Sequence, residues 1–231
     1  MNRYTPLLLL LAACCSSAVV AQDTARKDDA TAMVGGVTEN ELLTSGIVGT
    51  LSVEAVDLRR AGSLFGCSLV YKSVFSDAVY QNGRLNVAVG NITFASDTNA
   101  TGLSLKIGVR PLLTPDAKFE RPNFAYFKTS VASTAKTKQS AVDGDEGFKL
   151  FVYSIEDPVT QRILMSLIDE DILTIAFNRN PNGMDQQFEV DLRVEDMGVQ
   201  GTEFTRKKSS LAKTSFVSCM ASLLENPDTK K

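Results

Sequence analysis

The sequence contains no histidine and no tryptophan, and it has only four cysteines. Without histidine the chain lacks the commonest metal ligand and the commonest general base at neutral pH, which excludes catalytic arrangements built on imidazole. Basic residues are not in excess either, because 24 Lys and Arg stand against 27 Asp and Glu, for a formal charge of −3. Nucleic-acid-binding proteins need a basic surface, so no nucleic-acid partner is expected. These absences favour a non-enzymatic protein without cofactors.

Long hydrophobic runs are also missing, since no stretch approaches the roughly 20 apolar residues of a transmembrane helix. A short run, Leu7–Ala13, follows Arg3 and precedes small residues, which is typical of a secretory signal peptide over residues 1–21. Cleavage after Ala21 fits the small-residue rule. Alternatively, the residues before Cys14 resemble a bacterial lipoprotein box, which would make Cys14 a lipidation site. We therefore expect an exported protein of the bacterial envelope, periplasmic or lipid-anchored, with no transmembrane span.

After cleavage at Ala21, only Cys67 and Cys219 remain in the mature chain. Two cysteines in an oxidising compartment indicate one disulfide, and the alternative is two buried free thiols. Cys67 lies on the apolar face of an alternating strand, and Cys219 lies on the apolar stripe of a helix. We predict a structural bond between them that ties the C-terminal helix to the N-terminal sheet. A catalytic role is not expected, because burial among apolar neighbours raises the pKa of a thiol.

The clearest secondary-structure pattern lies between Gly147 and Val194. It predicts a strand, then a helix with Asp157 as N-cap and Pro158 in its first turn, and then two strands separated by an Asn-Pro-Asn-Gly turn. The helix is expected over residues 158–168. A second helix is expected over residues 209–224. Elsewhere the chain alternates between apolar and polar residues, with Asn-Gly at 82–83 as the strongest hairpin signal.

These patterns predict an α+β fold, a largely antiparallel β-sheet or sandwich of at least about seven strands with two helices packed on it. An edge strand is predicted around Pro122, since proline cannot donate a hydrogen bond to a neighbouring strand. After the signal, the predicted parts of the chain are a flexible tether with a short helical turn (22–46), an antiparallel β meander (47–127), a surface loop that is either functional or disordered (128–146), and a strand-helix-hairpin-helix unit that completes the same domain (147–226).

Three groups of polar residues were considered as sites, and we predict no catalytic or metal-binding residue among them. Asp143, Asp145 and Glu146 resemble the start of a calcium loop, but Ser154 stands where the bidentate acid is required. The acids at 169–171 are candidates for paired carboxylates, and are more simply a polar turn between helix and strand. Ser133 and Lys136 have Ser-x-x-Lys spacing in low-complexity sequence, without a glycine-rich elbow. An exported hydrolase using these carboxylates or the Ser-Lys pair is the alternative hypothesis.

Three segments, Ile163–Leu167, Asp171–Ile175 and Phe188–Leu192, are followed by Phe216 and Cys219 in the expected last helix. In this order the last third of the chain resembles periplasmic accessory proteins of the type VI secretion system. The chain departs from that family in lacking tryptophan and in a longer link, residues 195–208, before the last helix. The resemblance implies a non-enzymatic envelope protein that supports a larger machine.

The expected function is therefore binding or accessory, with another envelope protein as the partner. Exposed sheet edges present unpaired backbone groups to which a partner strand can add. The edge near Pro122 and the segment 128–146 are the expected binding sites. The hydrolase alternative would be favoured if the acids at 143–146 faced those at 169–171 across a deep pocket.

Overall fold

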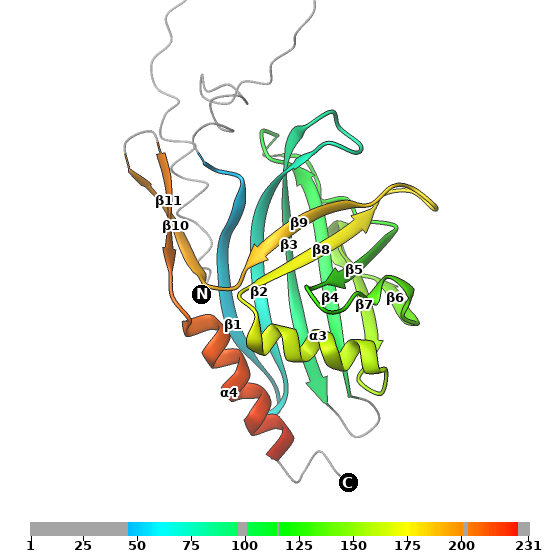
Figure 1. Ribbon diagram of the computed structural model, residues 1–231, viewed down its shortest axis with the longest axis vertical. Coiled ribbons are helices and arrows are strands. Elements are labelled where there is room, and N and C mark those ends of the chain that lie inside the picture. The colour runs from blue at the N-terminus through cyan, green and yellow to red at the C-terminus, as the bar shows by residue number, and fades with distance from the viewer. Residues whose placement is uncertain (1–45, 97–100, 115, 201–202, 226–231) are drawn as a thin grey trace, which may run out of the picture.

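The computed structural model describes residues 46–96, 101–114, 116–200 and 203–225 (Figure 1). The predicted signal peptide, Cys14 and all of the predicted tether except Gly46 lie outside the described residues. Within them the chain forms mostly antiparallel strands and two α-helices, which confirms the predicted predominance of antiparallel sheet. No helix in these ranges is long and apolar enough to cross a membrane.

The largest sheet has six antiparallel strands in the order β1-β2-β3-β4-β7-β6. They are β1 (Gly49–Arg60), β2 (Ser63–Asp77), β3 (Arg84–Ser96), β4 (Thr101–Pro111), β6 (Gln139–Asp143) and β7 (Lys149–Ser154). Strands β1 to β4 form the predicted meander. Asn82 and Gly83 both have positive φ, of 51° and 85°, as the Asn-Gly signal requires. Residues 78–81 extend this turn, in which the Asp77 side chain accepts a hydrogen bond from the Tyr80 N–H.

A second sheet has the order β5-β8-β9, and a separate hairpin is formed by β10 and β11. The bounds are β5 (Phe124–Lys128), β8 (Ile172–Asn178), β9 (Gln186–Asp191), β10 (Val194–Gln200) and β11 (Glu203–Lys208). Two expectations are corrected here. Residues 188–194 are not one strand, because the Asp191 side chain accepts hydrogen bonds from the backbone and side chain of Arg193 and ends β9 in a tight turn. The link at 195–208 is a hairpin.

The segment 128–146, predicted as a surface loop, contains β6 and two short 3₁₀ helices, η1 (Thr134–Lys136) and η2 (Asp145–Gly147). The composition of β6 (Gln-Ser-Ala-Val-Asp) gives little strand propensity, so local sequence did not reveal it. The five residues of β6 become a strand through antiparallel pairing with Lys149–Tyr153 of β7. The predicted surface loop at 128–146 is therefore wrong where β6 and the two short helices form, although β6 is largely exposed.

The two helices lie within two residues of their predicted bounds: α3 is Pro158–Asp169 and α4 is Leu211–Glu225. The Asp157 side chain accepts hydrogen bonds from the N–H groups of Val159 and Thr160, as expected of an N-cap. The Leu211 N–H donates to the Ser209 hydroxyl, 3.1 Å away, at the start of α4. Figure 1 shows α3 running across the lower end of the sheets and α4 beside β1.

One core cluster joins the inner face of the six-stranded sheet to the three-stranded sheet and to both helices. Its largest members are aromatic; for example, the Phe75 ring stacks on Phe188 and meets Phe177 edge-on. Ile163 and Leu167 of α3 and Phe216 of α4 belong to the same cluster. A smaller cluster, which includes Leu51, Val74, Leu85, Val87 and Met197, lies at one end of the opposite, outer face. The inner face is therefore filled, while much of the outer face remains accessible.

Candidate functional site

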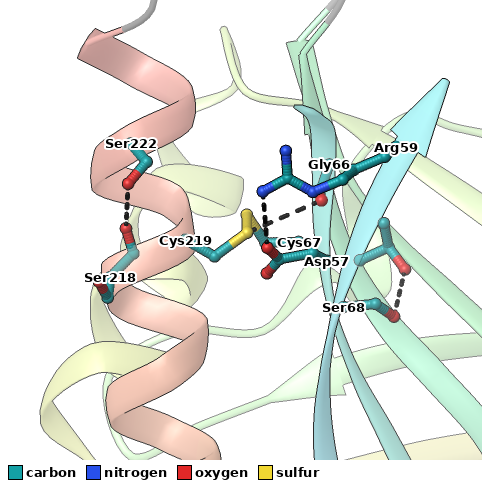
Figure 2. Close-up of a disulfide and its surroundings, with 9 residues drawn as sticks. Asp57, Arg59, Gly66, Cys67, Ser68, Ser218, Cys219 and Ser222 are labelled. Atoms are coloured by element: carbon teal, nitrogen blue, oxygen red, sulfur yellow. Dashed lines mark hydrogen bonds and ion pairs between the residues drawn. A yellow bond between two sulfur atoms is a disulfide. The ribbon is translucent and has the colours of Figure 1, made fainter. Parts of the chain in front are cut away.

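Cys67 on β2 and Cys219 on α4 form a disulfide, with sulfur atoms 2.03 Å apart and Cα atoms 5.8 Å apart (Figure 2). The fully buried Cys67 belongs to the core cluster, as does Cys219, which is 8% exposed. The Cys219 sulfur also lies 3.8 Å from the Gly66 carbonyl oxygen, a contact rather than a hydrogen bond because a disulfide sulfur carries no hydrogen. The position of the bond indicates a structural role, because it links cysteines 152 residues apart in the sequence. It also leaves no reactive thiol at either position.

Strand β5 is an edge strand close to Pro122, as predicted, but its outer backbone groups already have partners. The Ala125 carbonyl accepts from the Tyr153 hydroxyl at 2.8 Å, and the Phe127 N–H donates to the buried Thr134 hydroxyl at 3.0 Å. Burial raises the pKa of Tyr153, so its hydroxyl remains a neutral donor. This edge therefore offers little to an added strand, and the binding site expected there is not supported.

Strand β6 is one of the two outer strands of the six-stranded sheet, the other being β1. It pairs on one side with β7. Four of its five residues are exposed and the fifth is half-buried. In Figure 1 it lies at the right-hand margin, with no described element beyond it. An edge of this kind presents backbone N–H and C=O groups that can pair with another chain.

The side chains around β6 add an apolar element to this edge. Val142 is 57% exposed and lies opposite Leu150 of β7, while Ser140 lies opposite Val152. Both β7 residues are half-buried and share the outer face of the sheet with Val142. Together Ser140, Val142, Leu150 and Val152 form what we call the β6 edge patch. A strand added here would gain backbone hydrogen bonds and apolar contact at alternate positions.

Three of the candidate catalytic acids, Asp143, Glu170 and Asp171, are held in structural contacts. Asp143 pairs with Arg121 at 2.6 Å. Asp171 pairs with both Arg193 and Lys213 at 3.1 Å. The Ser130 hydroxyl donates to Glu170 at 2.8 Å and lowers its pKa, the opposite of what a general acid needs. One surface pocket lies beside Arg179 and another on the outer face of the six-stranded sheet. Neither is lined by the acids at 143–146 or at 169–171.

Ser133 and Lys136 lie together in and just before the 3₁₀ helix η1, but the serine has a local role. Its hydroxyl caps η1 by accepting a hydrogen bond from the Ala135 N–H at 3.4 Å. Lys136 is the basic residue of the last turn of the same short helix. The Ser-x-x-Lys spacing therefore reflects a helix cap. No hydrogen bond between Ser133 and Lys136, which a lysine-activated serine nucleophile would need, accompanies it in the described residues.

A polar network that sequence reasoning missed surrounds Arg179, which follows β8. Its guanidinium pairs with the fully buried Asp77 carboxylate at 3.1 Å and with Glu120 at 2.5 Å, and it lies over the Tyr80 ring. Arg179, Glu120 and Tyr80 line a pocket of about 380 Å³. Because two carboxylates already neutralise the arginine, we interpret the network as a structural tie between the β2–β3 turn, the chain before β5 and the end of β8. No local signal marks it, since its three charged members, Asp77, Glu120 and Arg179, lie 43 to 102 residues apart in the chain.

The chain was compared with protein-family models, with curated proteins and with solved structures. None of the three comparisons found a match.

Proposed function

We propose that this chain is a non-enzymatic binding protein of the bacterial cell envelope that engages another envelope protein through the β6 edge patch. The observation that carries the proposal is the exposed strand β6, which is paired on one side only and lies beside the half-exposed aliphatic residues of β7. Strand addition at such an edge supplies affinity through backbone hydrogen bonds and specificity through alternate side chains.

Export is part of the same proposal, and the disulfide supports it. Structural disulfides form and persist in the periplasm and outside the cell, and are rare in the reducing cytosol. The bond between Cys67 and Cys219 is buried in the core, where it is protected from exchange. The resemblance of the last third of the chain to type VI secretion accessory proteins points to a secretion machine as the assembly that the partner would belong to.

A substitution in the patch tests the proposal. Val142→Lys places a charged side chain on the exposed strand, a change that natural proteins use to prevent strand addition. The disulfide-bonded protein and this variant would be used to capture partners from envelope extracts of the source bacterium, after photo-crosslinking from position 141. We expect a discrete crosslinked partner with the unsubstituted chain and its loss with the variant.

Val131→Lys is the matched control, because Val131 is also an exposed valine, at 66%, but lies outside the strand. It should retain the crosslinked partner. Equal capture by both variants, or loss from both, would show that β6 is not the binding edge. Circular dichroism of each variant verifies that the fold is unchanged.

A further inference from the structure

A groove of about 580 Å³ lies on the outer face of the six-stranded sheet, away from the β6 edge patch. Its lining runs across the strands, from Arg110 on β4 through Val89 on β3 and Lys72 on β2 to β1, and it reaches Leu211 at the start of α4. Three inter-strand spacings separate β4 from β1, so the groove crosses about 14 Å of sheet. This volume is within the range of small-molecule sites.

The part of the groove over β2 to β4 is cationic. Lys72 lies opposite Val89, and Arg110 lies opposite Val87 on the same face, so the two basic side chains are separated by β3 alone. The Arg110 guanidinium lies over the Phe119 ring, 5.3 Å from the ring centroid, within the reach of a cation–π contact. Lys72 forms no ion pair with a carboxylate within the described ranges. Burial and the nearby Arg110 charge lower the pKa of Lys72, which agrees with two cations held close together on an apolar floor.

The rest of the groove is mainly apolar. Val70 and Val89 form part of its floor, and Leu211, which is 65% exposed, lies at its far end. Two carboxylates also line it. Glu54 of β1 lies opposite Val70 of β2. Glu195 forms an ion pair with Lys207 at 2.6 Å. The charges are thus divided, with the cations on β2 and β4 and the acids on β1 and β10.

The backbone beneath the groove limits what can occupy it. Strands β2 and β3 are paired on both sides, so their N–H and C=O groups are already satisfied. A peptide lying across them would leave its own backbone groups unpaired, at a cost in free energy for each one. An acyl chain has no such groups, so it can be buried here by apolar contact alone.

We propose that this groove binds a single-chain fatty carboxylate, with its carboxylate at Lys72 and Arg110 and its acyl chain over Val70 and Val89 toward Leu211. The charge of the head complements the two cations, and the acyl chain matches the aliphatic floor. This site is separate from the β6 edge patch, so neither proposal depends on the other.

Dodecanoate is the probe, and the full mature chain is titrated with it calorimetrically below the micelle concentration. We expect one molecule bound per chain. Lys72→Gln should weaken this binding by about tenfold, because it removes one of two charges on the carboxylate. Dodecanol, which has the same acyl chain and no charge, should bind more weakly and should be insensitive to Lys72→Gln.

Lys106→Gln is the matched control, because Lys106 is also on the outer face of the sheet but lies over the Phe148 ring. Its binding of dodecanoate should remain within about twofold of the unsubstituted chain. A photoreactive fatty acid bound to the unsubstituted chain should crosslink to β2 or β3, which tests the site even if a variant fails to fold. Equal affinity for dodecanol and dodecanoate, equal effects of the two lysine substitutions, crosslinks elsewhere, or binding to anionic vesicles without binding to dodecanoate would each overturn the proposal.

Discussion

Arg206 shows how one side chain on β11 fixes the beginning of the first strand. Its guanidinium donates to the carbonyl oxygens of Gly46, Ile47, Val48 and Thr50 at 2.6 to 3.0 Å. Gly49 lies against this guanidinium with φ of 119°, and a Cβ there would be 3.1 Å from the Arg206 Nη2 atom. The five donors of arginine can satisfy several carbonyls at once, whereas lysine acts as a single point charge.

Arg206→Lys should therefore lower the free energy of unfolding by about 2–3 kcal/mol, because the partly buried carbonyls of Ile47 and Thr50 lose charge-assisted hydrogen bonds. Urea denaturation measures the change, and faster hydrogen exchange at residues 47–53 should accompany it. Lys207→Gln is the control, since the Lys207 side chain is 75% exposed and its ion pair is expected to contribute no more than about 1 kcal/mol. An equal loss in both variants would contradict this role of Arg206.

The disulfide also acts at the scale of single residues. Replacing Cys67 and Cys219 together by serine should lower the free energy of unfolding by about 2–5 kcal/mol, mainly because the unfolded chain regains the entropy of a long loop. Urea unfolding with and without reductant measures this. Reductant should shift the midpoint of the unsubstituted chain alone. Two free thiols in the unreduced, unfolded protein would instead show that the bond does not form.

At the scale of elements, Asp191 connects the end of β9 to the β10–β11 hairpin. Its carboxylate pairs with Arg193 at 2.9 Å and with Lys208 at 2.8 Å. Burial alone would raise the pKa of Asp191, but the hydrogen bonds from Arg193 and Lys208 and the charge of Lys208 outweigh it and hold the pKa well below its usual range.

A pKa lower in the folded than in the unfolded state means that Asp191 stabilises the fold above its unfolded pKa of about 3.9. This contribution is lost as the pH falls from there toward the folded pKa. Asp191→Asn should thus lower stability at pH 7 by roughly 1–3 kcal/mol and flatten the decline of stability below about pH 5. Unfolding measured from pH 7 to pH 2 tests this. Glu156→Gln, at an exposed position before α3, should leave the profile unchanged; an unchanged profile for Asp191→Asn would refute the role of Asp191.

At the scale of the whole molecule, the first prediction concerns export. The mature chain should begin at Gln22, or at a lipidated Cys14 if the lipoprotein reading is correct. Intact-mass spectrometry of protein purified from the envelope fraction distinguishes the two, because the second form is heavier by residues 14–21 and by the lipid. A mature mass that retains residues 1–13, or a mainly cytoplasmic distribution, would contradict export.

The β6 edge patch and the outer groove occupy different parts of the molecule, and this separation can be tested. Val142→Lys should leave dodecanoate affinity within about twofold, and Lys72→Gln should leave partner crosslinking unchanged, because distant sites usually contribute independently. Titration and crosslinking of both variants measure this. Loss of both activities in either variant would indicate a change in the fold rather than in a site.

The sequence by itself determined the elements whose signals are local. Asp157 and Pro158 mark the start of α3, alternation marks β2 and β8, and Asn82-Gly83 marks a turn with positive φ. The pairing of Cys67 with Cys219 was also inferable, because each lies on an apolar face and the described residues contain no other cysteine. These features depend on backbone preferences and apolar periodicity within a few residues.

Only the tertiary structure decided that the edge of β6 is exposed and that the edge of β5 is covered. Strand β6 has little strand propensity of its own and forms because β7 supplies hydrogen-bonding partners. The edge of β5 is closed by Tyr153 and Thr134, which come from other parts of the chain. Lys72 and Arg110 become neighbours only when β3 lies between β2 and β4. The physical reason is common to all three, since each depends on which segments pack or pair in three dimensions, which local propensity does not encode.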